Sequence, residues 1–297
     1  MIIDGKLLSQ EVKEKVKIKA KDFENTYGRK IGLAVIIVGN RPDSQTYVKN
    51  KVKACEQCGI ESFQYTLDES IKQERLESLI KALNDSNEVD GILVQMPLPK
   101  HIDENKIINI ISREKDVDGF RKDSNCIPCT PKGILYMLEK AYAQETLNGK
   151  TALVIGRSDV VGKPIAKLLL DKNCNIMQAH SKTPSHILHK MFSFADIVIS
   201  AAGKVDIISE NDAEQYRKDN RHDFYGDFSN KKDRVIIDVG INRLSNDTKI
   251  NGDFSEQFKA RFSNKYTPVP GGVGPMTIAM LLDNTIELAY KNMENNI

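Results

Sequence analysis

Tyr47 and Lys51 are the first residues along the chain whose types and spacing suit proton transfer. Residues four apart in a helix lie on one face, and Ser44 extends the same stripe. A lysine ammonium beside a tyrosine phenol can act in acid–base chemistry when both face a substrate. The same spacing is common on solvated helix faces, so this pair alone does not establish an active site.

Two further polar candidates follow apolar segments. Gln95 comes directly after the apolar run 91–94, and open α/β sheets bind their ligands at the carboxyl edge of the strands. Asp118 is the second carboxylate of Lys115-Asp-Val-Asp-Gly119 and stands beside a turn glycine. The simpler alternatives are a glutamine that caps a loop and an ordinary Asp-Gly turn.

A candidate phosphate site begins at Gly156-Arg157-Ser158, between an apolar run and a helical pattern. Backbone N–H groups at such a helix start can bind phosphate oxygens, although the segment departs from the usual GxGxxG pattern. The next strand ends in Ala179-His-Ser181, where an enzyme that uses NAD would carry a carboxylate for the ribose hydroxyls. With Arg157 available to pair with a 2′-phosphate, these residues predict NADP rather than NAD as the cofactor.

A second glycine-rich segment runs from Pro268 to Thr277. Its glycines would let the backbone approach a ligand closely, and Pro275 suits the first position of the helix that follows. Such runs also occur in plain connectors, but the density of glycine and proline here favours a binding loop.

Two Cys-x-x-Cys pairs, Cys55 with Cys58 and Cys126 with Cys129, raise the alternative of a zinc-dependent binding module. The two pairs are much farther apart than the roughly 15–20 residues of a ribbon-type zinc site. The first pair also lies within a helical pattern. We therefore expect no metal, and free thiols of the kind that reduced cytosolic proteins bury.

The apolar periodicity predicts an α/β protein with two parallel sheets. In the first part of the chain we expect helices and strands in alternation over residues 8–23, 31–38, 43–58, 63–67, 71–83 and 91–95. After a turn-like linker at 147–150, a Rossmann-type dinucleotide-binding unit is expected, with strands at 151–155, 176–179, 195–200 and 235–240. Residues 276–290 form a last helix, and the polar stretch 209–234 is expected to be helix fragments and loop.

The composition narrows the function classes. The 297 residues contain 43 Lys and Arg against 41 Asp and Glu, and this near balance of charge argues against a nucleic-acid or membrane-surface binder. No apolar run approaches the ~20 residues that cross a bilayer, and the N-terminus lacks the pattern of a signal peptide. We expect a cytoplasmic protein that acts on a small molecule, without nucleic-acid or membrane partners.

Seven segments in order resemble one family, the bifunctional methylenetetrahydrofolate dehydrogenase/cyclohydrolases of one-carbon metabolism. The resemblance covers essentially the whole chain. It is carried by residues 47–51 (Tyr-Val-Lys-Asn-Lys), 94–99 (Val-Gln-Met-Pro-Leu-Pro), 115–120, 128–131, 156–158, 237–242 and 268–277.

The resemblance implies roles for particular residues. It implies that Lys51 is the catalytic lysine, that Gln95 is its partner, that Asp118 binds the pterin and that Tyr47 stacks on it. The other implied folate contacts are Ser44, Val94, Met96, Pro270, Gly271, Gly272, Val273 and Gly274. The implied NADP contacts are Gly156, Arg157, Ser158, Ser181 and Ile241.

The resemblance also implies the reaction and the domain organisation. The enzyme would oxidise 5,10-methylenetetrahydrofolate with NADP and hydrolyse the methenyl product to 10-formyltetrahydrofolate. Residues 1–147 and 276–297 would form a discontinuous folate-binding domain, and 148–275 the NADP-binding domain, with the active site in the cleft between them and two chains in a homodimer. The stretch 209–234 is longer and more polar than is typical of the family.

Tyr47-x-x-x-Lys51 also resembles the catalytic pair of short-chain dehydrogenases. In those enzymes the glycine-rich cofactor segment precedes the pair, whereas here Gly156 follows it. The order of the motifs therefore favours the folate enzyme over this alternative.

Overall fold

The computed structural model describes residues 1–143, 146–219, 233–243 and 250–295. The chain forms two compact units. The unit that we call N-terminal contains Ser9–Cys129 and Ile278–Ile297, and the central unit contains Met1–Leu8 and Thr130–Thr277. The sequence predicts domain boundaries at 147/148 and 275/276, whereas the compact units divide at 8/9, 129/130 and 277/278.

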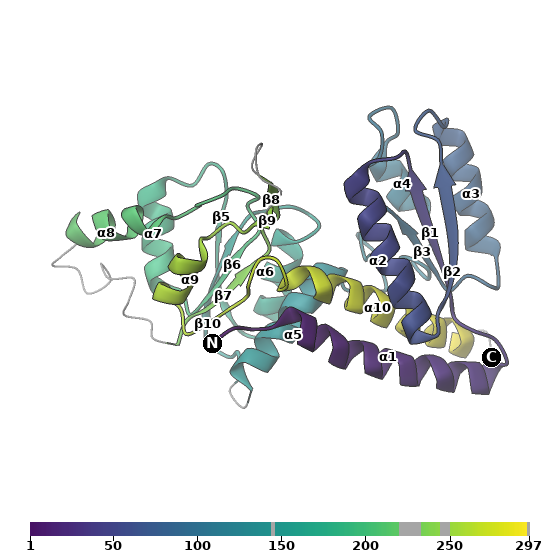
Figure 1. Cartoon of the computed structure of the whole chain (residues 1–297), viewed down its shortest axis with the longest axis horizontal. Helices are drawn as coiled ribbons and strands as arrows, with labels where there is room; N and C mark the ends of the chain where they lie inside the picture. Colours follow the sequence, from purple (N-terminus) through teal and green to yellow (C-terminus); the bar gives the residue numbers. More distant parts are fainter. Residues whose placement is uncertain (144–145, 220–232, 244–249, 296–297) are drawn as a thin grey trace. The chain divides into compact units, whose positions relative to one another are not determined.

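The N-terminal unit is built on a three-stranded parallel sheet in the order β2-β1-β3 (Figure 1). Its strands are β1 (Gly32–Val38), β2 (Glu61–Leu67) and β3 (Gly91–Val94). The helices that lie wholly or mainly in it are α1 (Gly5–Tyr27), α2 (Pro42–Cys58), α3 (Gln73–Asp85), α4 (Glu104–Ile110) and α10 (Val273–Asn295).

Burial on both faces explains the continuous apolar run of β1, whose seven residues are all buried. Ala34 and Ile36 point into a core with Leu76 and Ile80 of α3. The opposite face is closed by other elements, since a Cβ on Gly91 would meet side chains of Leu33, Val117 and Thr285. Helices α2 and α3 flank the sheet on opposite sides (Figure 1).

The central unit holds a five-stranded parallel sheet in the order β10-β7-β6-β4-β5. Its strands are β4 (Thr151–Ile155), β5 (Asn175–Ala179), β6 (Ile197–Ser200), β7 (Val235–Asp238) and β10 (Lys265–Tyr266). Two short strands, β8 (Asn242–Arg243) and β9 (Ile250–Asn251), pair antiparallel. The helices are α5 (Cys129–Tyr142), α6 (Gly162–Asp171), α7 (Ser185–Phe194), α8 (Glu210–Asp219) and α9 (Glu256–Phe262).

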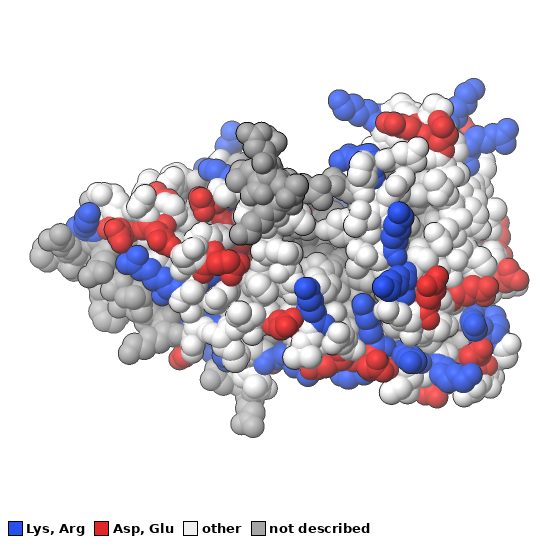
Figure 2. Space-filling model, in the orientation of Figure 1, with Lys and Arg blue, Asp and Glu red and all other residues white. Residues whose placement is uncertain are grey.

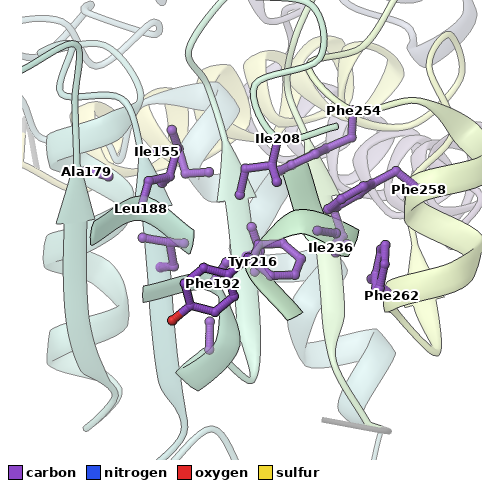
Figure 3. Close-up of a cluster of buried hydrophobic side chains, with 14 residues drawn as sticks. Ile155, Ala179, Leu188, Phe192, Ile208, Tyr216, Ile236, Phe254, Phe258 and Phe262 are labelled. Atoms are coloured by element: carbon purple, nitrogen blue, oxygen red, sulfur yellow. The ribbon is translucent and has the colours of Figure 1, made fainter. Parts of the chain in front are cut away.

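An aromatic core covers one face of this sheet (Figure 3). Phe192 of α7 packs on Phe258 of α9, with ring centroids 5.5 Å apart. Phe254 stacks on Phe258 at 5.1 Å. These rings cover Ile155 of β4, so the segments that follow the strands rest on a rigid base.

The strand order fixes where a ligand can bind in the central unit. Read from the β5 edge, the strand order is β5-β4-β6-β7-β10. The chain therefore passes from β4 to its neighbour on one side, and from β6 to its neighbour on the other side. Open parallel sheets bind ligands at such a switch point, outside the carboxyl ends of the strands. The segments after Ile155 and Ser200 therefore border the expected nucleotide site.

The expected secondary structure is confirmed for the main strands and helices, with boundaries shifted by a few residues. In the polar stretch 209–234 the structure has helix α8, and residues 220–232 lie outside the described residues. Arg234, at the end of that stretch, is fully buried and donates to the carbonyl oxygens of Ala195 and Phe262.

The surface agrees with the balanced composition. On the face shown in Figure 2, acidic and basic side chains are interspersed over the described residues. Within the described part of the chain, no helix combines the length and apolar character that a membrane crossing requires.

Candidate active site

Lys51 lies on the inner face of α2. Its side chain is buried together with those of Ser44 and Cys55, and the residue is only 9% exposed. Tyr47, one turn earlier, is 38% exposed. The helix that carries them starts with Pro42 at its first turn and ends at Gly59, which has a left-handed φ of 76°. The lysine side chain is therefore buried and not part of a solvated face.

Gln95 is the hydrogen-bond partner of this lysine. Lys51 Nζ donates to Gln95 Oε1 at 3.0 Å. The glutamine is itself fixed, because its side-chain amide donates to Met96 O at 2.7 Å and its backbone N–H donates to Ile36 O at 2.8 Å. The structure thus brings together a predicted pair separated by 44 residues in sequence.

The two aspartates near Gly119 have different tasks. Asp116 is buried and accepts hydrogen bonds from the backbone N–H groups of Gly119 and Arg121 at 3.2 and 3.0 Å. Asp118 accepts no hydrogen bond from any residue that the structure describes, and it is partly exposed. One carboxylate therefore shapes the turn, and the other remains available to a ligand.

The pKa of Asp118 is raised to about 6, and the chief cause is burial. The positive charge of Lys51 opposes this rise, while the neighbouring Asp116 adds to it. The electrostatic interaction with Lys51 means that Gln95, Lys51 and Asp118 form one polar group within the N-terminal unit. A site for a polar heterocycle can use Lys51 for proton transfer and the carboxylate of Asp118 as a hydrogen-bond acceptor.

The remaining predicted folate contacts of this unit line the end of β3. Val94 is the last residue of the strand and is buried, whereas Met96 is half-buried. The peptide bond between Met96 and Pro97 is cis.

The turn after β4 in the central unit leaves no room for a side chain at Gly156 or Gly162. Gly156 has φ of 122°, and a Cβ there would lie 2.5 Å from Ala201 O. A Cβ on Gly162 would lie 2.4 Å from Gly156 O. Ser158 Oγ accepts a hydrogen bond from Val161 N at 3.2 Å, which orders the turn before α6. This close approach of backbone segments fits a site for a dinucleotide phosphate.

The other predicted cofactor residues are exposed in the central unit. Arg157 and Ser181 are exposed, and Ser181 follows the end of β5 in a turn where His180 N donates to Thr183 Oγ1 at 3.0 Å. Ile241, between β7 and β8, is 55% exposed. An exposed isoleucine beside the carboxyl edge of the sheet can lie against a ligand.

The glycine-rich loop is held by the N-terminus of the chain. Ile3 N donates to Tyr266 O at 2.7 Å, just before this loop. A Cβ on Gly5 would lie 1.8 Å from Gly272 O, so the start of α1 and the loop touch through bare backbone. The role of Gly5 is not visible in the sequence, because its partner Gly272 is distant along the chain and no local turn pattern marks Gly5.

No group of three or more His, Cys, Asp or Glu side chains is arranged to hold a metal ion among the residues that the structure describes. Cys55 and Cys58 are buried on the inner face of α2. Burial raises the pKa of the Cys55 thiol to about 12. A thiol that resists ionisation is a poor metal ligand.

Comparisons with known proteins match both halves of the chain. The family model for the tetrahydrofolate dehydrogenase/cyclohydrolase catalytic domain matches residues 3–118. The model for the NAD(P)-binding domain of the same family matches residues 128–217 and 224–293. The chain belongs to the tetrahydrofolate dehydrogenase/cyclohydrolase family. The resemblance found in the sequence is confirmed, and so is the two-domain α/β fold.

Individual members of the tetrahydrofolate dehydrogenase/cyclohydrolase family are similar over nearly their whole length. The bifunctional protein FolD of Campylobacter hominis is 46% identical, over 99% of this chain and 98% of its own. A crystal structure of the FolD dehydrogenase/cyclohydrolase from Campylobacter jejuni has a TM-score of 0.86 at 42% identity and covers 98% of this chain and 99% of its own. The Trypanosoma brucei FolD, in complex with NADP and an inhibitor, has a TM-score of 0.87 at 31% identity and covers 99% and 98% of the two chains.

Proposed function

We propose that this protein oxidises 5,10-methylenetetrahydrofolate to 5,10-methenyltetrahydrofolate with NADP, and hydrolyses the product to 10-formyltetrahydrofolate. Membership of the family supports both activities, and relatives at 46% and 43% identity carry the name of the bifunctional enzyme. The observation that carries the proposal is the hydrogen bond between the buried Lys51 and Gln95, together with the electrostatic interaction between Lys51 and the carboxylate of Asp118.

NADP supplies the hydride acceptor for the methylene carbon of the folate. The protein contributes orientation, because hydride transfer depends on alignment of the two reacting carbons. We assign the stacking of the pterin to Tyr47, whose ring is partly exposed on α2. Asp118 would accept hydrogen bonds from the amino-pyrimidinone edge of the pterin in a fork geometry.

The hydrolytic step needs a group that handles protons. Water adds to the cationic methenyl carbon and gives up one proton to a base. The remaining hydroxyl proton passes to one ring nitrogen as the bond between that nitrogen and the carbon breaks, which leaves the formyl group. Lys51 is the group that we assign to this proton transfer, and Gln95 holds its Nζ in place. In the N-terminal unit, the other folate contacts that we assign are Ser44, Val94 and Met96. In the central unit, the folate contacts that we assign are Pro270, Gly271, Gly272, Val273 and Gly274.

Gly156, Arg157, Ser158, Ser181 and Ile241 are the proposed contacts of NADP. The turn at Gly156 suits the pyrophosphate, and the exposed Arg157 suits the 2′-phosphate. The solved relative from Trypanosoma brucei contains NADP, which supports this choice of cofactor.

We further propose that residues 1–147 with 276–297 act as the folate-binding domain and 148–275 as the NADP-binding domain. A cytoplasmic homodimer is the proposed form, and sedimentation equilibrium of the purified protein would test the dimer.

An assay of both products tests the proposed function. Purified protein is incubated with 5,10-methylenetetrahydrofolate and NADP, and NADPH, methenyltetrahydrofolate and 10-formyltetrahydrofolate are followed together. Formation of NADPH followed by the formyl product is expected. Formation of neither product would overturn the proposal, and NADPH without the formyl product would remove its hydrolytic half.

A further inference from the structure

Two aspartates to which neither the sequence motifs nor the proposed mechanism assigns a role are buried at the carboxyl edge of the central sheet. Asp238 ends β7 and is 1% exposed, and Asp253 follows β9 and is 0% exposed. A buried carboxylate is costly unless hydrogen bonds compensate for its lost hydration. The hydrogen bonds of Asp253 connect it to the segments that follow β6 and β7.

Asp253 accepts hydrogen bonds from the end of β6 and from the segment that follows it. Its Oδ2 accepts hydrogen bonds from Ser200 Oγ at 2.7 Å and from Ala202 N at 2.8 Å. Its Oδ1 accepts one from Lys204 N at 3.0 Å. Successive N–H groups wrapped around one carboxylate fix the path of the backbone. This segment includes Ala201, whose carbonyl oxygen lies against Gly156 in the phosphate-binding turn.

The same carboxylate also holds the segment that follows β7. Asn242 Nδ2 donates to Asp253 Oδ1 at 2.9 Å. Asp238 supports this arrangement, because its Oδ1 accepts hydrogen bonds from Gly240 N at 3.0 Å and from Asp253 N at 2.9 Å. Ile241, a proposed contact of NADP, therefore stands between two residues that are tied to this pair of carboxylates.

The backbone is adapted to the two carboxylates. A Cβ on Gly240 would lie 2.3 Å from Asp253 Oδ1, and a Cβ on Gly252 would lie 2.1 Å from Asp238 Oδ2. Phe254, directly after Asp253, stacks in the aromatic core (Figure 3). The carboxylate is thus anchored to the rigid part of the unit, while the groups that it binds lie at the end of β6, in the loop that follows it and at the start of β8.

We propose that Asp253 is the positioning residue of the NADP site, holding the segments 201–204 and 240–242 on either side of it. The proposal rests on the proposed function, because it assigns Asp253 to the cofactor half of that site. Asp253 acts through the backbone of these loops, so it should govern the affinity for NADP and leave hydrolysis of the methenyl group unaffected.

Asp253→Asn tests this role with little change in volume. In either orientation its NH₂ group would face donors, since each carboxylate oxygen accepts at least one backbone N–H. We expect the KM for NADP to rise about tenfold or more, which corresponds to at least 1.4 kcal/mol. We expect the dehydrogenase kcat at saturating NADP to change less than twofold. Cyclohydrolase activity, measured on methenyltetrahydrofolate without NADP, should equal that of the parent.

Asp196→Asn is the matched control. Asp196 comes directly before β6, so it lies at the amino ends of the strands, away from Asp253. Its Oδ2 also accepts a backbone hydrogen bond, from Thr151 N at 2.8 Å. This variant should keep the parent KM for NADP. An equal rise in both variants, or a parallel loss of both activities in Asp253→Asn, would show a purely structural role and overturn the proposal.

Ser200→Ala keeps the test decisive if Asp253→Asn fails to fold. It removes a single hydrogen bond to the carboxylate and should raise the KM for NADP roughly threefold, with unchanged cyclohydrolase activity. An unchanged KM for NADP in a folded Asp253→Asn, or in Ser200→Ala, contradicts the positioning role. A parent protein without either activity would instead overturn the proposed function.

Discussion

Lys51 Nζ lies 3.0 Å from Gln95 Oε1 and donates a hydrogen bond to it, which joins the inner face of α2 to the residue after β3. The glutamine cannot turn away easily, because its amide also donates to Met96 O. The hydrogen bond thus holds the buried lysine in one position through a neutral acceptor. Asp118 is the acidic group with which Lys51 interacts electrostatically.

Lys51→Met should abolish hydrolysis of the methenyl group while impairing hydride transfer less. Methionine fills a similar volume in the buried stripe, so the fold is retained. We expect a loss of cyclohydrolase activity of roughly a hundredfold or more, as for removal of a general acid–base group. Methenyltetrahydrofolate should then accumulate in the coupled assay.

Lys53→Met, on the exposed side of the same helix, serves as the control and should leave both rates unchanged. A Lys51→Met enzyme that hydrolyses methenyltetrahydrofolate at the parent rate would contradict the assignment of proton transfer to this residue.

Asp118→Asn should weaken folate binding and stabilise the protein at neutral pH. Burial raises the pKa of Asp118 to about 6, above the value of about 3.9 for an exposed aspartate. The native state therefore favours the protonated carboxyl, and stability is lost as the pH rises from about 4 through 6. The asparagine cannot ionise, so its advantage over the parent should grow across this range, by on the order of 2–3 kcal/mol at 1.36 kcal/mol per pKa unit.

Chemical unfolding of both proteins at pH 4 and pH 8 measures this difference, and a constant difference across that range would refute the ionisation argument. In the parent enzyme, the KM for the folate should fall as the pH rises through about 6, because the carboxylate form accepts the hydrogen bonds of the pterin. Affinity for NADP should be the same in Asp118→Asn and the parent.

The order of strands and helices could be predicted because apolar runs such as that of β1 are long and bounded by glycines. The residues after β3 and β4 could be proposed as sites because their position in a parallel sheet places them at its binding edge. The burial of Lys51 could not be predicted from spacing, since residues four apart share a face without showing which way that face points. Here Lys51 is buried and Tyr47 is half-exposed.

Arg157→Ala should reduce the preference for NADP. The strand edge at Ser181 has no carboxylate that would favour NAD, so the affinity for NAD should change little. We expect the KM for NADP to rise about tenfold, as for loss of a charge-assisted hydrogen bond to the 2′-phosphate. Arg261→Ala, in which an exposed ion pair with Glu214 is lost, is the control. Equal changes for NADP and NAD would show that Arg157 does not contact the 2′-phosphate.

Replacement of Cys55 by Ala and of Cys58 by Ser should leave both activities intact. Both side chains are buried, and we expect only a packing cost of about 1–2 kcal/mol. Elemental analysis of the purified parent should find no stoichiometric zinc. About one zinc per chain, lost in the double variant together with stability, would revive the binding-module hypothesis.

The tertiary contacts of short polar residues and of glycines could not be predicted from the sequence. Asp253 is one of many aspartates until the fold brings Ser200 and Asn242 to it from other parts of the chain. Gly240 and Gly252 resemble turn glycines, yet each is required because a carboxylate lies where its Cβ would be. Such requirements depend on contacts between segments, and local patterns do not encode them.

Gly5→Ala should displace the glycine-rich loop and weaken folate binding. The added Cβ would lie 1.8 Å from Gly272 O, and this neighbour is backbone, so the loop or the start of α1 must move. We expect a loss of stability of about 1–3 kcal/mol, as for overpacking, and a rise of the KM for the folate of about tenfold. Gly28→Ala, at the other end of the same helix, is the control: no atom crowds its Cβ position, and its left-handed φ of +72° should cost only about 1 kcal/mol. A Gly5→Ala enzyme with the parent KM for the folate would show that the contact with Gly272 does not position the loop for substrate.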